Sequence, residues 1–269
     1  MIDSKLQIEL RKRYNPDGSD LRKAQLRMLS LLIFLDKVCK ENGLEYWLDS
    51  GTLIGAARHG GFIPWDDDMD VCMMKKDADR LKQILGGKIW DDHIVLQSND
   101  TDSHYYNASW MTLRDTQSEY VTDSYAHRIL KYRGVQIDIF VMEEDIPINL
   151  LKFSNKLFNF FITSPLYGRH GLTLLRPLVR WNYKLINKGL FSILRNIRKK
   201  STTISSGLGC SFLKIQEKDT VFPLSTLEFE GYYFNVPNDP NKYLTKLYKH
   251  WIQIPSNIKV HTEKINIYE

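Results

Sequence analysis

Long hydrophobic runs are missing from this 269-residue sequence. The longest apolar candidate, residues 157–168, contains polar residues and a proline. It therefore falls short of the roughly 18 uncharged residues that are needed to cross a bilayer. The first 15 residues also lack the basic-then-apolar order of a signal peptide. We expect a cytoplasmic protein with no membrane-spanning helix and no cleaved leader.

Cysteine is scarce, and its three positions (Cys39, Cys72 and Cys210) form no C-x-x-C pair. This spacing argues against a disulfide framework and against a zinc knuckle, and it favours a reducing compartment. The seven histidines form no H-x-H or H-x-x-x-H pair, so no histidine metal site is predicted. No internal repeat or low-complexity tract is visible, which excludes a repeat architecture.

Acidic residues are absent from residues 151–200, which hold 11 Lys and Arg, whereas the remainder of the chain holds 26 basic and 32 acidic residues. This basic segment is also rich in aromatic residues. Its cations at Arg176, Arg180, Lys184 and Lys188 recur at four-residue steps, which predicts a cationic amphipathic helix. We expect peripheral contact of residues 151–200 with the anionic inner face of the cytoplasmic membrane. The alternative is a packed helix whose basic face is only solvated.

The hydrophobic pattern alternates helices with strands, which predicts an α+β fold with a mixed sheet. We expect helices over 20–42, 53–58 and 77–85 and from about Asn238, the first of them with Ser19 or Asp20 as N-cap. We expect strands over 44–50, 65–74, 93–97, 108–114 and 134–142. A hairpin over 227–236 is expected to turn at Glu230-Gly231. Three regions follow from this pattern. Residues 1–147 form a catalytic core, residues 148–205 a basic, helical insertion that ends in a break over 201–209, and residues 206–269 complete the catalytic domain.

Four carboxylates crowd the stretch FIPWDDDMDV (62–71). On a strand over 65–74, Asp66, Asp68 and Asp70 would share one face. Carboxylates that lie so close repel one another and have raised pKa values unless a cation compensates them. Hard divalent ions prefer oxygen ligands, so the stretch predicts a site for Mg²⁺, with Mn²⁺ as the substitute. The alternative is a solvated acidic turn.

A second, isolated carboxylate supports the metal site. Asp138 lies in GVQIDIFV (134–141), where apolar neighbours indicate a buried strand. A buried acid is costly without a partner. The same metal ion would be that partner, and a structural salt bridge is the alternative.

The turn Ser50-Gly51-Thr52 leads from a strand into a helix, and such turns point backbone N–H groups at a phosphate. Arg58 and Arg114 are candidate additional phosphate ligands through bidentate contacts, or else members of surface ion pairs. A phosphate-binding turn beside metal-binding carboxylates is the equipment of phosphoryl transfer. The sequence therefore predicts an enzyme of this reaction class.

Three stretches carry a resemblance to a known family: YWLDSGTLIGAARHGGFIPWDDDMDV (46–71), LRDTQSEYV (113–121) and GVQIDIFV (134–141), with a looser likeness over 221–251. They resemble the LicD family of bacterial phosphocholine transferases, whose relatives include fukutin and the fukutin-related protein. The resemblance implies a nucleotidyltransferase fold of the DNA polymerase beta type. The cysteine-rich zinc insertion of the fukutin-related branch is absent, which places the chain among the compact bacterial members.

The resemblance also implies roles for individual residues. Gly51 and Thr52 correspond to the phosphate-binding turn, with Ser50 where relatives often have glycine. Asp68 and Asp70 correspond to the metal-binding pair, and Asp138 to the third carboxylate. Asp66 belongs to the same run, and either Asp66 or Asp138 would accept the proton of the attacking hydroxyl.

The implied donor is CDP-choline or another CDP-activated compound such as CDP-ribitol or CDP-glycerol. The implied acceptor is a sugar hydroxyl of a glycan or lipid-linked glycan, as in lipopolysaccharide, teichoic acid or capsule, with release of CMP and no nucleic-acid partner. One alternative is an enzyme of the same fold that transfers a nucleotide to a small-molecule hydroxyl. A second is a non-enzymatic membrane-associated protein, which would leave the carboxylates unexplained.

Overall fold

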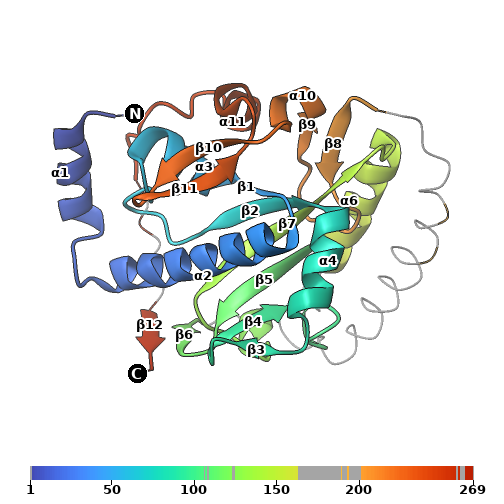
Figure 1. Cartoon of the computed structure of the whole chain (residues 1–269), viewed down its shortest axis with the longest axis horizontal. Helices are drawn as coiled ribbons and strands as arrows, with labels where there is room; N and C mark the ends of the chain where they lie inside the picture. Colours follow the sequence, from blue (N-terminus) through green and yellow to red (C-terminus); the bar gives the residue numbers. More distant parts are fainter. Residues whose placement is uncertain are drawn as a thin grey trace.

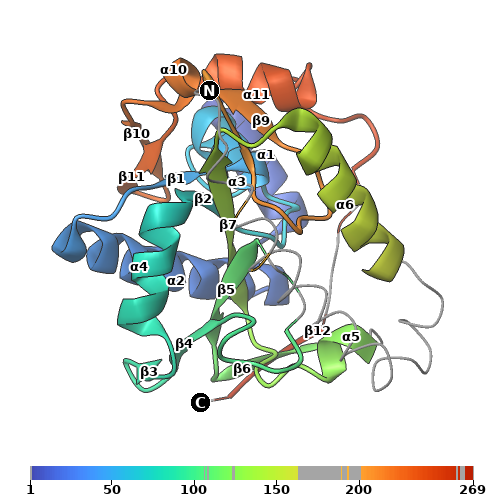
Figure 2. The same cartoon turned by 90° about the vertical axis from the view of Figure 1, so that its right-hand side faces the viewer.

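The computed structural model describes residues 2–105, 107, 109–122, 125–162, 201–258, 260 and 264–268, together with 189 and 193. It has the predicted α+β class, with helices packed on a mixed sheet (Figure 1). Figure 2 shows helices α2 (Asp20–Asn42) and α4 (Lys75–Leu85) on one side of the central strands and α6 (Ile148–Ile162) on the other. The sheet is therefore covered from both sides.

The main sheet has eight strands among the described residues. Its continuous path is β1 (Tyr46–Leu48), β2 (Asp70–Met74), β7 (Gln136–Glu144), β5 (Trp110–Asp115), β4 (Ile94–Gln97) and β3 (Ile89–Trp90). β8 (Thr203–Ser206) pairs with the far end of β7 and with β9 (Ile215–Glu217). β2 and β7 are parallel, and the other strand pairs of this sheet are antiparallel.

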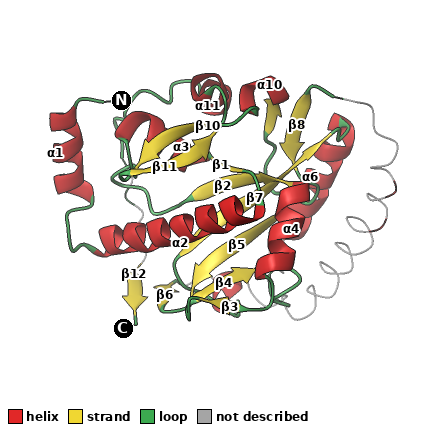
Figure 3. Ribbon diagram, viewed as in Figure 1, coloured by secondary structure: helices red, strands yellow, loops and turns green. Residues whose placement is uncertain are grey.

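Smaller elements surround this sheet. The remaining helices are α1 (Ser4–Tyr14), α3 (Ser50–Ile54), which continues as a π-helical turn η1 (Gly55–His59), α5 (Tyr125–Arg128), α10 (Lys218–Val221) and α11 (Pro240–Tyr248). Two antiparallel ribbons form from β10 (Ser225–Phe229) with β11 (Tyr232–Val236) and from β6 (Ser118–Val121) with β12 (Lys264–Ile267). Figure 3 shows the β10–β11 ribbon beside α3 and α11, where β11 also contacts β1.

Several predicted elements are confirmed. The Ser19 hydroxyl accepts a hydrogen bond from the Arg22 amide at the start of α2, and Gly43 ends this helix with φ of 61°. A left-handed glycine at this position is a common helix stop. The hairpin turns at Glu230 and Gly231, as expected. All three cysteines are buried and free.

The predicted strand over 65–74 is wrong in its first half, because β2 begins only at Asp70. Its neighbour β1 ends at Leu48, which pairs with Val71, so the chain before Asp70 has no antiparallel partner. Asp66 and Asp68 therefore lie in an irregular segment and do not share a strand face with Asp70. The expected helix over 53–58 is also displaced, since α3 begins at Ser50 with Asp49 as its N-cap.

β8 spans residue 205, the predicted end of the insertion, and lies within the predicted break over 201–209. Its pairing with β7 makes it part of the main sheet. Helix α6 confirms the helical character of the first part of the insertion. The predicted cationic stripe of Arg176, Arg180, Lys184 and Lys188 lies outside the described residues. None of the helices that the structure describes is long and apolar enough to cross a membrane.

Candidate active site

Two carboxylates lie side by side at the centre of the sheet. Asp70 on β2 and Asp138 on β7 are register partners in the parallel pair, and the Asp138 amide donates to the Met69 carbonyl at 2.8 Å. Neighbouring strands are about 4.8 Å apart, so this register alone holds the two acids close together. They are 68 positions apart in the sequence, and the structure unites them as predicted.

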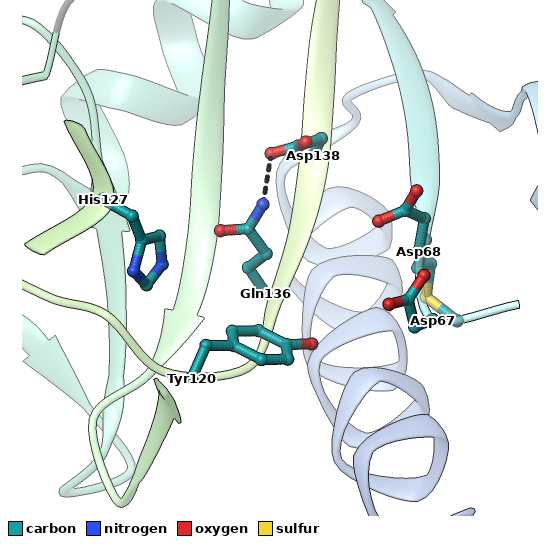
Figure 4. Close-up of a pocket in the computed structure, with 7 residues that line it drawn as sticks. Asp67, Asp68, Tyr120, His127, Gln136 and Asp138 are labelled. Carbon is teal, nitrogen blue, oxygen red and sulfur yellow. Dashed lines mark hydrogen bonds between the residues drawn. The ribbon is translucent and has the colours of Figure 1, made fainter. Parts of the chain in front are cut away.

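Burial dominates the electrostatics of this pair. It raises the pKa of Asp70 well above its ordinary value, and repulsion from Asp138 and Asp68 raises it further. It also raises the pKa of Asp138 to about 6, although a hydrogen bond from Thr112 opposes this rise. The Thr112 hydroxyl donates to Asp138 Oδ1 at 2.9 Å and the Gln136 amide donates to the same atom at 3.3 Å (Figure 4). Both acids are half-buried, and two such acids that repel each other are stabilised when a cation binds between them.

Three further carboxylates extend the acidic centre. One oxygen each of Asp66, Asp67 and Asp68 lies within 4.8 Å of the other two. Burial, with repulsion from Asp68 and Asp67, raises the pKa of Asp66 to about 7. Asp68 is exposed, and its charge also raises the pKa values of Asp70 and Asp138. This oxygen-only set of ligands fits a hard divalent ion such as Mg²⁺ or Mn²⁺.

The first turn of α3 packs against the same acids. The Thr52 hydroxyl accepts a hydrogen bond from the Asp70 amide at 2.8 Å. Ser50 adopts a φ of 48°, and a Cβ at Gly51 would lie 2.6 Å from Asp66 Oδ2. Only glycine allows the Asp66 carboxylate to approach the backbone this closely. The predicted turn and the predicted acids therefore form one site.

Two cavities meet at this site. The first, of about 510 Å³, is lined by Ser50, Gly51, Thr52, Asp66, Asp68, Asp70, Phe140, Phe212, Leu213, Lys214, Leu247 and Tyr248. The second, of about 300 Å³, is lined by Asp67, Asp68, Met69, Tyr120, His127, Gln136 and Asp138 (Figure 4). Asp68 lines both, so ligands in the two cavities would meet at the acidic centre.

The two predicted arginines have internal roles instead of the expected phosphate contacts. Arg58 is buried, and its guanidinium donates to the backbone carbonyls of Trp251 at 2.6 Å and Gln253 at 3.0 Å. Arg114 is also buried and donates to the carbonyl of Gly134 at 3.0 Å. Neither side chain lines either cavity. Arg58 fixes the chain after α11, and Arg114 fixes the strand ends beside β7.

A lysine that the sequence analysis missed supplies a cation to the first cavity. Lys214 precedes β9, and its ammonium group forms a salt bridge with Asp49 and lies 3.3 Å from the Ser50 hydroxyl. Both partners are buried, Asp49 at 0% exposure and Lys214 at 5%. Burial lowers the pKa of Lys214 to about 7. The Tyr243 hydroxyl donates to the other Asp49 oxygen at 2.8 Å.

The sequence did hold a signal for Lys214. It is a lone charge in the run FLKI, next to Phe212 and Leu213 in the cavity wall, and the same kind of pattern identified Asp138. The polar side chains of the second cavity, Tyr120, His127 and Gln136, were also missed. They come from β6, α5 and β7, and no local pattern joins them.

Fold and site together define a mixed α+β domain with a carboxylate centre, and part of this domain matches a known family. Residues 43–131 match the family model described as LicD/FKTN/FKRP, nucleotidyltransferase domain. The chain therefore carries a LicD-family domain related to fukutin and FKRP, and the predicted resemblance is confirmed.

Individual relatives differ in how much of each chain is aligned. The lipopolysaccharide cholinephosphotransferase LicD of Haemophilus influenzae is 26% identical over 250 residues, which cover 87% of this chain and 92% of the relative. The human ribitol 5-phosphate transferase FKRP is 43% identical over 76 residues, 27% of this chain and 15% of the relative. An uncharacterized protein of Rickettsia prowazekii is 40% identical over 74 residues, 28% of this chain and 26% of the relative.

Proposed function

We propose that this protein is a metal-dependent phosphotransferase that moves phosphocholine, or a related phospho-polyol, from a CDP-activated donor to a sugar hydroxyl of a cell-surface glycan. The observation that carries the proposal is the Asp70–Asp138 pair in register beside a cavity that is lined by the turn Ser50-Gly51-Thr52. Similarity to LicD over nearly the whole of both chains supports the choice of choline as the first head group to test. The proposed fold is the nucleotidyltransferase fold of the DNA polymerase beta type.

Asp68, Asp70 and Asp138 would hold Mg²⁺ or Mn²⁺, and the bound ion would neutralise charge on the diphosphate. The turn Ser50-Gly51-Thr52 and Lys214 orient the phosphates in the first cavity. The apolar wall, with Phe140, Phe212 and Tyr248, packs against the cytosine base and excludes water.

Bond making and breaking follow from this placement. The acceptor oxygen forms a bond to the phosphorus of phosphocholine, and the bond from that phosphorus to the bridging oxygen breaks. CMP departs with the electron pair. The proton of the hydroxyl passes to a carboxylate, for which Asp138 and Asp66 are the two candidates, since both lie at the acidic centre.

The products of the reaction test this proposal. With CDP-choline, Mg²⁺ and a glycan extract, we expect CMP and a glycan heavier by one phosphocholine, detected by chromatography and mass spectrometry. EDTA should stop the reaction, and added Mg²⁺ or Mn²⁺ should restore it. Release of pyrophosphate from CTP or another nucleoside triphosphate, with no CMP from CDP-choline, would instead support the nucleotidyltransferase alternative.

We also propose peripheral contact with an anionic membrane at the start of the basic segment. On α6, Leu151 and Phe158 are buried, whereas Phe153 and Phe160 are 57% and 71% exposed. Lys152 is exposed on the same helix. Exposed aromatic residues beside cations suit the headgroup region of an anionic bilayer, where each cation contributes about 1 kcal/mol.

Vesicle sedimentation tests this contact. We expect the protein to sediment with anionic but not neutral vesicles and to be released by moderate salt. Phe153→Ser with Phe160→Ser, or glutamine at all four of Arg176, Arg180, Lys184 and Lys188, should weaken sedimentation. Ile8→Ser is the matched control, because Ile8 lies on α1 and is 66% exposed. This substitution should not weaken sedimentation. Equal sedimentation of all variants would contradict a membrane-facing role.

A further inference from the structure

The second cavity is walled by two different kinds of side chain. On one wall lie the phenol of Tyr120, the imidazole of His127 and the amide of Gln136, and on the other lie carboxylates (Figure 4). The rings of Tyr120 and His127 pack edge to face, with centroids 6.3 Å apart. The cavity therefore offers neutral hydrogen-bonding groups opposite strong acceptors.

The charge of this cavity excludes anions. None of the described residues that line it is Lys or Arg, whereas Asp67, Asp68 and Asp138 are acids. Burial, together with repulsion from Arg114 and Arg133, lowers the pKa of His127 to about 4 although Glu119 opposes this fall, so the imidazole is neutral at pH 7. The lining residues that the structure describes therefore disfavour a phosphate or carboxylate relative to a neutral ligand.

His127 also has unused hydrogen-bonding capacity. Its Nδ1 atom is buried and has no hydrogen-bond partner within the described part of the chain. A buried polar atom without a partner costs free energy, and a ligand hydroxyl could supply the missing bond. Gln136 is oriented by its bond to Asp138 at 3.3 Å, so its amide links the neutral wall to the acidic centre.

The first cavity is also lined by three acids, Asp66, Asp68 and Asp70, but it adds a cation and an apolar wall. It contains the cation Lys214 and the apolar side chains Phe140 and Phe212, whose ring centroids lie 5.2 and 5.4 Å from the lysine ammonium. Phosphates and a base fit there, whereas a neutral polyhydroxyl compound fits the second cavity. Because Asp68 lines both cavities, a hydroxyl in the second cavity reaches the same carboxylate as a phosphate in the first.

We propose that the second cavity is the acceptor subsite and that it selects a neutral sugar, with the acceptor hydroxyl directed at Asp68 and Asp138. Tyr120, His127 and Gln136 bind the other hydroxyl groups of that sugar. The assignment of this sugar as acceptor rests on the proposed function, but the predicted preference for a neutral polyhydroxyl ligand rests on the lining alone.

Binding measurements on the full chain test the proposal. Saturation-transfer NMR uses methyl galactoside and methyl glucoside as neutral probes and methyl glucuronide as the anionic probe, and calorimetry measures CMP binding in Mg²⁺. We expect at least one neutral glycoside to bind and the glucuronide not to bind. Gln136→Leu, and separately the conservative Tyr120→Phe, should weaken glycoside binding at least about fivefold and change CMP affinity less than about twofold.

The reciprocal variants complete the design. Phe212→Leu and Tyr248→Phe in the first cavity should weaken CMP and spare the glycoside, and His93→Gln, which lines neither cavity, should change neither. Three results would overturn the inference: the wild type binds no glycoside, it binds the glucuronide equally well, or both second-cavity variants bind the glycoside as the wild type does. A wild type that binds the glycoside but not CMP would instead contradict the proposed function and leave the neutral-sugar site supported.

Discussion

Asp70→Asn is expected to reduce transfer more than about a hundredfold, a rise of about 2.7 kcal/mol in the barrier, without destabilising the metal-free protein. In the proposed mechanism the variant loses a metal ligand at the point where the diphosphate would bind. It also removes one member of a half-buried pair whose mutual repulsion, added to desolvation, raises the pKa of Asp70. Asp138→Asn should behave likewise, because an asparagine oxygen can still accept the hydrogen bond from Thr112. Turnover assays and thermal melts in EDTA measure the two effects.

The pH dependence of stability has a definite sign. The pKa of Asp138 is about 6 in the folded protein and 3.8 ordinarily, so the folded state binds the proton more tightly. Stability of the metal-free wild type therefore falls as the pH rises from about 4 to about 6 and then levels off. Asp138→Asn should remove this pH dependence, so that above pH 6 the metal-free variant is more stable relative to the wild type than at pH 4. Saturating Mg²⁺ should cancel this difference in stability.

A surface acid is the matched control for these variants. Asp79 on α4 pairs with Lys75 in solvent, and Asp79→Asn should leave turnover and melting temperature unchanged. If Asp70→Asn or Asp138→Asn retains more than about a tenth of wild-type turnover, that residue is not a metal ligand.

Lys214→Met is expected to lower the free energy of unfolding by about 3–5 kcal/mol, because it leaves the Asp49 carboxylate charged and buried without its cation. The same variant removes the cation from the first cavity, so CMP affinity should fall as well. Denaturant titration measures the first effect and calorimetry the second.

A double variant separates lost packing from the uncompensated charge. Lys214→Met combined with Asp49→Asn should recover most of the lost stability but not the CMP affinity. Lys218→Met, which removes a lysine from partly exposed pairs with Glu144 and Asp145, should cost less than about 1 kcal/mol. A single variant Lys214→Met as stable as Lys218→Met would show that the buried pair is not important for the fold.

The parts of the fold that were predicted are those with local causes. The apolar period and the caps of α2 lie within one stretch of chain, and so does the turn of the hairpin at Glu230 and Gly231. Asp138 was identified because an acid between apolar neighbours needs a partner wherever the partner lies. Asp68 and Asp70 were identified in the same way, although their shared strand face was wrong because β1 ends too early to pair with Asp68.

The parts that were missed depend on distant contacts. Arg58 resembles a phosphate ligand in the sequence, and only the carbonyls of Trp251 and Gln253, almost 200 positions away, explain its burial. The role of Lys214 could be predicted only from the position of Asp49, its partner in the fold. The second cavity could be predicted only from the way three separate elements come together. Sequence patterns identify groups that require partners, but they do not identify distant partners.

The buried contacts of Asp49 also determine when this protein can become active during synthesis. Its partners Lys214 and Tyr243 leave the ribosome 165 and 194 residues later. At a translation rate of about 5–20 residues per second, the lysine and the tyrosine that cover the turn after β1 are synthesised roughly ten to forty seconds after it. Until then the Asp49 carboxylate must stay hydrated, so the nascent chain cannot complete the wall of the first cavity. Translation therefore delays completion of this cavity until most of the chain has been made.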